Sequence, residues 1–247
     1  MKSTAIVIPA RLDSKRLPGK LLLTWKSKEI LRHVFETAES LASRSVAVWV
    51  ATDNQRIKEC VESWGGNVFI SSGKMQNGTE RVQDFAKVHK HDFYINVQGD
   101  DPTMSTKVLE TTIAEINEGK FQVVTPHYQI NLVETLIDPN KVKLVKDKAG
   151  KVLYFSRSVI PYKTIESSLL QQNNLESEVH LGHIGVYGYT HLALDSYVSF
   201  PESKLEISEK LEQLRFLEIG IDIGTFKVSF TPCSIDCIED LEYLEGR

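Results

Sequence analysis

The stretch AIVIPARLDSKRLPGK, residues 5–20, joins a short apolar run to a loop that carries four cations in ten residues. The run at 5–9 is typical of a strand buried on both faces, and similar runs recur at 46–51, 67–70 and 93–97. Amphipathic stretches separate these runs and lie at 30–41, 56–64, 81–88 and 108–116. Because this alternation requires parallel pairing with crossovers, residues 1–120 are predicted to form a doubly wound, mostly parallel sheet of the α/β class.

The pattern of expected strands and helices changes after Gly119. Shorter strands are expected at 123–128, 142–146 and 152–155, the last two joined by a turn at 148–150, and a further strand at 180–189. Helices are expected at 206–218 and 238–244, and the polar stretch 165–179 is expected to be a surface loop or arm. The second half is therefore predicted to add a smaller antiparallel lobe, so that residues 1–247 form a single domain in two parts, 1–120 and 121–247.

The composition is that of an ordinary globular protein. Of the 247 residues, 41% are hydrophobic and 25% are charged, which argues against a disordered chain or a disulfide scaffold. With 29 Lys and Arg against 33 Asp and Glu the net charge is −4, so a protein that wraps nucleic acid is not expected, and any anion site must be local. The three cysteines are read as reduced thiols, and no apolar run is long enough for a signal segment or a membrane span, so we expect a cytoplasmic protein without a membrane partner.

The basic loop at 11–20 lies where an open parallel sheet binds its ligand, beyond the carboxyl end of a strand. Arginine grips phosphate oxygens with two parallel hydrogen bonds, and lysine acts as a movable point charge. The loop is neither a Walker loop nor a GxGxxG motif. It therefore indicates a polyphosphate site, with a solvated surface loop as the alternative that composition alone leaves open.

A second polar site follows the strand at 93–97, where the sequence continues as QGDDP. A carboxylate at this point can hold Mg²⁺ while phosphate supplies other ligands. The alternative is that Asp100 or Asp101 caps a turn before Pro102. A basic loop after one strand and a carboxylate after another is the arrangement that metal-dependent phosphoryl or nucleotidyl transfer requires, which favours the first interpretation.

Six strings of the chain, taken in order, resemble the 3-deoxy-manno-octulosonate (Kdo) cytidylyltransferases, also called CMP-Kdo synthetases. They are PAR-x-x-S-x-R-LPGK at 9–20, NGTER at 77–81, NVQGD-x-P at 96–102, LYFSRS at 153–158, HIGVYGY at 183–189 and LEQLR at 211–215. The resemblance covers nearly the whole chain. It implies a Rossmann-like nucleotidyltransferase fold, with a nucleotide-binding half at 1–120 and a sugar-binding and dimerisation part at 121–247.

The resemblance also implies a reaction. The anomeric hydroxyl of an eight-carbon acid sugar attacks the α-phosphorus of CTP, giving a CMP-sugar for lipopolysaccharide biosynthesis and pyrophosphate, with Mg²⁺ as cofactor and a homodimer as the assembly. The implied catalytic residues are Arg11, Lys20 and Asp100, and the implied metal ligands are Asp100 and Asp236. The implied nucleotide-binding residues are Arg11, Ser14, Lys20, Asn77, Gly78, Thr79, Arg81 and Gln98, and the implied sugar-binding residues are Gln98, Arg157, His183, Glu212 and Gln213.

Each of these residues has a plainer alternative taken by itself. Arg81 and Arg157 could form surface ion pairs, His183 could be a hydrogen-bonded strand histidine, and Glu212 could point outward from a helix. The chain also departs from the family, most clearly at Asn77, where the family has serine, and at Asp101, where it commonly has glutamate. A variant acid sugar, such as the 8-amino form or a nonulosonic acid, therefore stays open as substrate, as does a catalytically inactive nucleotide-binding protein.

Overall fold

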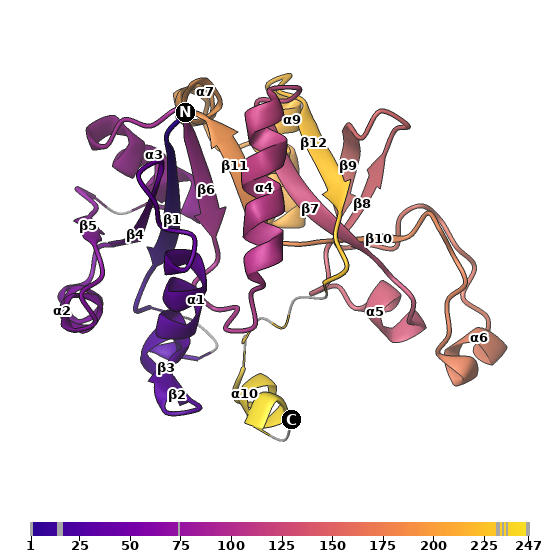
Figure 1. The fold of residues 1–247 in the computed structure, drawn as a ribbon. Helices are drawn as coiled ribbons and strands as arrows, with labels where there is room; N and C mark the ends of the chain where they lie inside the picture. Colours follow the sequence, from indigo (N-terminus) through magenta and orange to yellow (C-terminus); the bar gives the residue numbers. More distant parts are fainter. Residues whose placement is uncertain are drawn as a thin grey trace.

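A single large sheet forms the centre of the molecule in the computed structural model, which describes residues 2–13, 17–73, 75–230, 233, 235 and 237–245 (Figure 1). Ten strands of the described residues make up this sheet: β1 (Thr4–Ala10), β4 (Val46–Thr52), β5 (Val68–Ile70), β6 (Phe93–Val97), β7 (Val123–Gln129), β8 (Lys143–Lys146), β9 (Val152–Ser156), β10 (Leu181–His183), β11 (Val186–Thr190) and β12 (Ile223–Lys227). Their order is β5-β4-β1-β6-β11-β7-β10-β8-β9, and β12 pairs with β7. A two-stranded sheet, β2 (Thr24–Trp25) with β3 (Lys28–Glu29), lies apart from it.

Helices cover both faces of the large sheet. One face packs against α1 (Ile30–Glu39), α2 (Gln55–Ser63) and α4 (Thr106–Glu118), and the other against α3 (Gly78–Val88), α7 (His191–Ser199) and α9 (Leu214–Glu218). In Figure 1, α4 stands in front of the sheet. The remaining short helices are η1 (Lys20–Leu22), α5 (Val133–Ile137), α6 (Ser167–Gln172), α8 (Lys204–Glu209) and α10 (Ile238–Glu245). None of the helices in the described residues is long and apolar enough to cross a membrane.

Strand β1 shows why its sequence is continuously apolar. Ile6, Ile8 and Ala10 belong to the core under α1, α2 and α4, whereas Ala5 and Val7 belong to the core on the opposite face. A strand buried on both faces has no solvent side on which a polar residue would be favourable. The parallel pairs β1–β4, β4–β5 and β1–β6 confirm the predicted parallel sheet, and the antiparallel pairs β8–β9 and β8–β10 confirm the expected extension.

The strand expected at 180–189 is divided into β10 and β11 by Ile184 and Gly185. Five residue steps, from His183 to Gly188, face three steps on β7, from His127 to Val124. The outer edge of β10 then pairs with β8, whereas the outer edge of β11 pairs with β6. The sheet therefore divides at this irregularity. Val97, the last residue of β6, still pairs with Val186 of β11, and Gln98, which follows it, lies beside the interruption at Gly185.

The prediction of a single helix at 206–218 is wrong for its middle residues, which separate two short helices. Helix α8 begins earlier, at Lys204, because Ser203 and Glu206 form a capping box, and it ends at Lys210, whose φ of 55° is left-handed. Helix α9 starts again only at Leu214. As a result Glu212 and Gln213 lie in the connection between two helices and not on a helix face.

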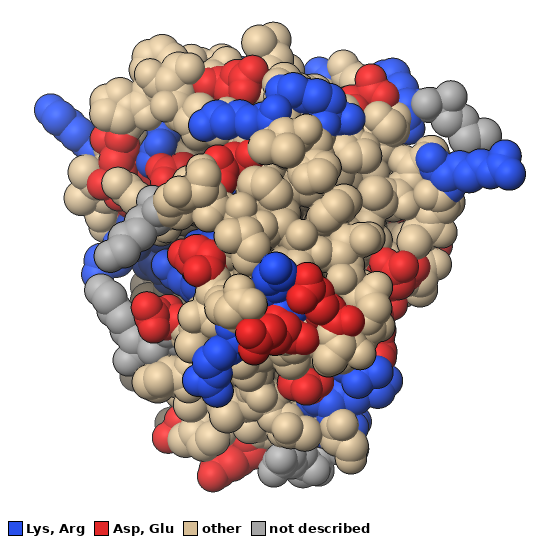
Figure 2. Space-filling view, turned by 90° about the vertical axis from the view of Figure 1, so that its left-hand side faces the viewer, with Lys and Arg blue, Asp and Glu red and all other residues tan. Residues whose placement is uncertain are grey.

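The polar segment 165–179 contains α6 and extends from the end of the sheet at the right of Figure 1. At the opposite end, Lys and Arg side chains are interspersed with Asp and Glu on the face that carries α2 and β5 (Figure 2). Strand β12 and helices α5 and α7 were not expected from the sequence. Beneath the sheet, α10 packs on the β2–β3 hairpin through a separate apolar cluster that includes Trp25, Ile235 and Leu244.

Candidate active site

The loop after β1 and the turn after β6 lie side by side because β1 and β6 are neighbouring parallel strands. Gly99 makes the close approach possible, since a Cβ atom on it would lie 3.1 Å from Leu31 Cδ1 and 3.5 Å from the carbonyl oxygen of Pro9. The basic loop is closed by a hydrogen bond from Gly19 N to Leu12 O at 3.1 Å, with Gly19 in the left-handed conformation (φ 70°) that glycine adopts without strain. Arg11 is exposed at this strand end.

Lys20 and Asp100 form an ion pair at this junction. Lys20 Nζ lies 2.5 Å from Asp100 Oδ2 and donates a second hydrogen bond to the carbonyl oxygen of Ile235 at 2.9 Å. The amide of Ile235 in turn donates to Asp100 O at 2.9 Å. Ile235 is therefore held against Lys20 and against the backbone of Asp100, the predicted metal ligand. Two predicted residues, Ser14 and Asp236, lie outside the described residues.

Asp101 differs from Asp100 in its surroundings. Its side chain is buried, and Oδ1 accepts hydrogen bonds from Thr103 Oγ1 at 2.7 Å and from Thr103 N at 3.2 Å. Burial raises the pKa of this carboxyl group. The turn-capping alternative therefore applies to Asp101, and Asp100 is the carboxylate that faces the basic loop.

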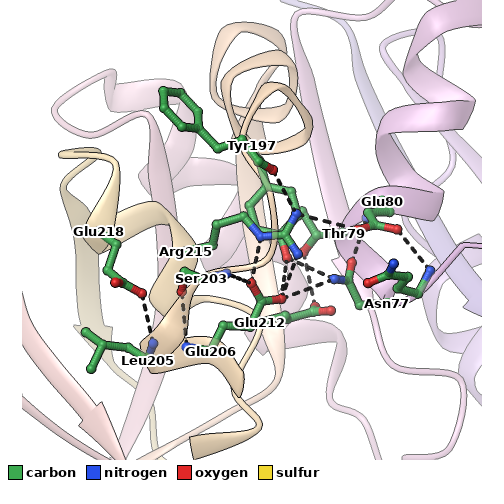
Figure 3. Close-up of polar contacts among 12 residues, drawn as sticks. Asn77, Thr79, Glu80, Tyr197, Ser203, Leu205, Glu206, Glu212, Arg215 and Glu218 are labelled. Atoms are coloured by element: carbon green, nitrogen blue, oxygen red, sulfur yellow. Dashed lines mark hydrogen bonds and ion pairs between the residues drawn. The ribbon is translucent and has the colours of Figure 1, made fainter. Parts of the chain in front are cut away.

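The predicted nucleotide residues at the start of α3 meet one of the predicted sugar residues (Figure 3). Glu212 Oε2 accepts a hydrogen bond from Gly78 N at 3.1 Å, and Glu212 Oε1 accepts one from Thr79 Oγ1 at 3.1 Å. Burial raises the pKa of Glu212. Glu212 points toward α3, so the alternative in which it faces outward from a helix is wrong.

Asn77 caps helix α3. Its Oδ1 accepts a hydrogen bond from Glu80 N at 2.9 Å, and its Nδ2 donates to the hydroxyl of Tyr197 at 2.9 Å. Serine and asparagine are both favoured helix N-caps, so Asn77 can cap α3 as a serine would. In this structure both polar atoms of the Asn77 side chain are bonded to the protein.

Arg157 and His183 lie on the far side of the sheet division. The Arg157 guanidinium donates to main-chain carbonyls: Nε to Glu209 O at 2.8 Å, Nη1 to Pro139 O at 2.9 Å and Nη2 to Lys210 O at 3.4 Å. It is therefore not a surface ion-pair residue. His183 Nε2 lies 3.0 Å from Thr125 Oγ1, and burial lowers the pKa of the imidazole to about 3, so the ring is neutral.

Arg81, Gln98 and Gln213 complete the predicted set. Arg81 is buried and donates from Nη2 to Asp53 Oδ2 at 2.9 Å and from Nη1 to Ser71 Oγ at 3.3 Å, so its guanidinium holds the carboxyl end of β4. Gln98 follows β6 and lies against Gly185. A Cβ atom placed on Gly185 would lie 3.2 Å from Gln98 Cγ. Gln213 is buried, and its Nε2 has no hydrogen-bond partner among the described residues.

A family model described as cytidylyltransferase matches residues 5–223. The chain belongs to the cytidylyltransferase family. The 3-deoxy-manno-octulosonate cytidylyltransferase of Escherichia coli is 37% identical over 251 residues, covering 100% of this chain and 98% of that protein. The 8-amino-3,8-dideoxy-manno-octulosonate cytidylyltransferase of Shewanella piezotolerans is 36% identical, covering 99% and 98%.

A solved structure of CMP:2-keto-3-deoxy-manno-octonic acid synthetase complexed with CTP superposes on this cytidylyltransferase with a TM-score of 0.86. Its sequence is 35% identical, and the match covers 99% of this chain and 97% of that one. These similarities confirm the resemblance, the fold class and the assignment as a nucleotidyltransferase.

The donor set at Asp100 is compatible with Mg²⁺. The described residues contain no cluster of three or more Asp, Glu, His or Cys side chains that could hold a metal ion. Mg²⁺ commonly binds through only one or two carboxylates and completes its shell with water and substrate phosphates. A partly exposed carboxylate beside a phosphate-type loop therefore fits this ion without a larger protein cage.

Several residues that shape the cytidylyltransferase site were not predicted. Lys143 is buried and donates to three carbonyls, including Arg157 O, while Glu209 accepts from Arg157 N at 2.9 Å. On the other side of the site, Tyr197, Glu206 and Arg215 support Asn77 and Glu212 (Figure 3). The spacing Ser203-x-x-Glu206 is a capping-box signal that could have located the start of α8 in the sequence.

Proposed function

We propose that this cytidylyltransferase transfers the cytidylyl group of CTP to 3-deoxy-manno-octulosonate, releasing pyrophosphate and producing CMP-Kdo for lipopolysaccharide biosynthesis. The observation that carries the proposal is the contact of Glu212 with Gly78 and Thr79. It brings a residue expected to bind the sugar against residues expected to bind the nucleotide. Two substrates bound by these groups would lie next to each other, which is what direct transfer requires.

The reaction needs alignment and charge compensation. The anomeric oxygen forms a bond to the α-phosphorus, the bond from that phosphorus to the bridging oxygen of pyrophosphate breaks, and the hydroxyl proton is released. Arg11 and Lys20 stand where they can neutralise the triphosphate and the departing pyrophosphate. Mg²⁺, when bound at Asp100, would add Lewis-acid stabilisation of the phosphate oxygens and favour loss of the hydroxyl proton.

The sugar is expected to lie near the division of the sheet, beside Gln98, His183 and Gln213. Neutral His183 can exchange hydrogen bonds with sugar hydroxyls, and the Nε2 group of Gln213 is a donor without a partner in the described structure. Arg157 is proposed to bind the sugar carboxylate. Its longest bond, from Nη2 to Lys210 O at 3.4 Å, is the one that such a ligand would displace.

The decisive experiment is pyrophosphate release by the purified protein with Mg²⁺ and CTP, offering Kdo, 8-amino-Kdo and N-acetylneuraminate in parallel, with ATP, GTP and UTP as nucleotide controls. Release with CTP and Kdo is the expected result. Release with the amino sugar alone would move the assignment to that substrate, a second candidate because relatives of both names match the chain to a similar degree. Binding of the nucleotide without release of pyrophosphate in the presence of any of the sugars would favour an inactive binding protein.

The homodimer and the cytoplasmic location are further proposals that rest on the resemblance. The second part of the chain exposes several large apolar side chains, among them Leu132, Ile137, Leu153, Tyr162, Leu170 and Val179. Where such side chains lie together on a surface, they are typical of association surfaces. Light scattering on the purified protein is expected to give twice the mass of the chain, and the mass of one chain would contradict the dimer.

A further inference from the structure

A buried ion pair lies behind the site and takes no part in the proposed chemistry. Arg215 Nε lies 2.7 Å from Glu206 Oε2 and Arg215 Nη2 lies 2.8 Å from Glu206 Oε1, and both side chains are nearly inaccessible to solvent. Two parallel bonds of this kind fix the orientation of both groups. The pair therefore provides a rigid support for whatever is bonded to it.

The connection that carries Glu212 is anchored to this pair at both ends. The amide of Leu211 donates to Glu206 O at 3.2 Å, and the amide of Arg215 donates to Glu212 O at 3.2 Å. Glu206 also holds the start of α8 through its capping box with Ser203. The position of Glu212, on the sugar side of the site, is thus set from Glu206 and Arg215.

One hydroxyl group joins this support to the nucleotide side of the site. The Tyr197 hydroxyl donates to Glu206 Oε1 at 3.2 Å and accepts from Asn77 Nδ2 at 2.9 Å (Figure 3). The ring of Tyr197 also lies 4.0 Å from the guanidinium carbon of Arg215. The other links from the Glu206–Arg215 pair to the nucleotide side are longer: Asn77 Nδ2 is 3.5 Å from Glu206 Oε1, and Arg215 Nη1 is 3.5 Å from Glu80 Oε1. Glu212 itself makes a second, direct connection through its 3.1 Å contacts with Gly78 N and Thr79 Oγ1.

We propose that Tyr197 is a positioning residue that couples the two substrate subsites, through a hydroxyl that connects the cap of α3 to the Glu206–Arg215 pair. Because the link runs through the rigid Glu206–Arg215 pair, a ligand that holds the cap of α3 also holds the Glu212 connection, and a ligand that holds Glu212 also holds the cap of α3. Each substrate therefore improves the affinity for the other. This inference rests on the proposed function, because it assigns one subsite to CTP and the other to the acid sugar.

The test compares Tyr197→Phe with Tyr94→Phe. Tyr94 is also buried, and its hydroxyl accepts from His91 N at 2.9 Å and donates to His89 O at 3.2 Å, at the opposite end of β6. Initial rates are measured over a grid of CTP and sugar concentrations. In wild-type protein, saturating CTP is expected to lower the apparent KM of the sugar about fivefold, which corresponds to the free energy that one hydrogen bond contributes. The ratio of the sugar KM at low CTP to the sugar KM at saturating CTP is expected to be the same in Tyr94→Phe.

In Tyr197→Phe that ratio is expected to fall below the wild-type value, with both KM values raised and kcat within about twofold of wild type, while the direct contacts of Glu212 with α3 retain the remaining coupling. A general structural effect would lower the melting temperature of both variants and leave the ratio unchanged. Asn77→Ser is a second variant that keeps a cap of α3 but shortens the reach to Tyr197. The double variant is expected to show no further loss of coupling beyond the more affected single variant.

Two outcomes overturn the inference: a wild-type ratio of 1, or a ratio in Tyr197→Phe equal to that in Tyr94→Phe. Failure of the proposed function looks different, because then wild-type protein turns over none of the sugars. Calorimetry with CTP alone still decides the positioning role in that case. The inference requires several-fold weaker CTP binding in Tyr197→Phe and unchanged binding in Tyr94→Phe, and equal affinities would overturn it.

Discussion

Lys20 Nζ contacts Asp100 Oδ2 at 2.5 Å, so that a cation from the loop after β1 is paired with a carboxylate from the end of β6. The two residues are eighty positions apart in the sequence. They meet because the carboxyl ends of parallel neighbouring strands lie at the same edge of a sheet. The pair holds Lys20 and Asp100 against each other at the edge of the sheet where the triphosphate is proposed to bind.

Asp100→Asn is expected to reduce turnover by at least about a hundredfold, because the variant loses the negative charge that would hold Mg²⁺ and orient Lys20. Unfolding should change little, since the Asp100 side chain is partly exposed and the backbone contacts with Ile235 remain. Pyrophosphate release and a thermal melt measure the two effects. Normal turnover would contradict the metal role of Asp100, and a large fall in melting temperature would point to a structural role.

The sequence could predict this junction because each part has a local signal. Strands such as β1 are continuously apolar since both faces are buried, and the charged residues follow directly after them. The break between α8 and α9 has no such signal. It occurs at Lys210, which adopts the left-handed backbone conformation although it is not a glycine. No glycine or proline lies nearby in the sequence to mark the break.

The residues that support the site could not be predicted from the sequence, because their roles depend on contacts between distant segments. Tyr197 is an unremarkable aromatic residue in the sequence, and its role depends on Asn77 and Glu206 arriving at its hydroxyl from two other helices. Strand β12 was likewise not predicted, and it forms by pairing in parallel with β7 and by a bridge from Gly224 to Lys151. Contacts of this kind arise from the tertiary fold, and local propensity does not encode them.

Leu244→Ala is expected to detach α10 from the β2–β3 hairpin before the main domain unfolds. Leu244 is buried in a small cluster with Trp25 and Ile235, separate from the two main cores, and the truncation should cost about 2 kcal/mol of local packing. Because Ile235 also contacts Lys20 and Asp100, activity should fall together with the detachment. The fluorescence of Trp25, in a background with Trp49→Phe and Trp64→Phe, reports the change as a red shift.

Ile238→Ala is the matched control for this variant, since Ile238 lies on the same helix with its side chain exposed. It should leave both the Trp25 emission and the activity unchanged. If the Trp25 emission of Leu244→Ala shifts only at the temperature at which the whole protein unfolds, then α10 is not a separate unit of stability.

His127 is expected to make the protein less stable in mild acid. Burial lowers the pKa of this imidazole to about 4, helped by the charges of Lys146 and Lys227, whereas a histidine in the unfolded chain has its ordinary pKa of 6.5. Between these values the unfolded chain binds more protons, so the free energy of unfolding falls as pH drops from 6.5 toward 4, by up to about 1.4 kcal/mol per pH unit. Above pH 6.5 the contribution is constant.

Denaturant unfolding of wild type and His127→Asn at a series of pH values tests this expectation. Asparagine can replace the hydrogen bond from His127 Nδ1 to Thr225 Oγ1, 2.8 Å in the structure, without a titrating group. The two stability curves should converge as pH falls below 6.5. Curves that stay parallel down to pH 4 would show that His127 does not titrate differently in the folded state.

Glu212→Leu is expected to weaken binding of both substrates. The two carboxylate oxygens accept from Gly78 N and Thr79 Oγ1, and a leucine side chain of similar size offers an acceptor to neither donor. A buried donor left without its acceptor costs about 1–3 kcal/mol, so the KM values of CTP and the acid sugar should each rise by about tenfold or more. Steady-state kinetics with each substrate varied in turn measure the two effects. A rise confined to the sugar would show that the contact with α3 does not position the nucleotide side, and that Glu212 acts on the sugar alone.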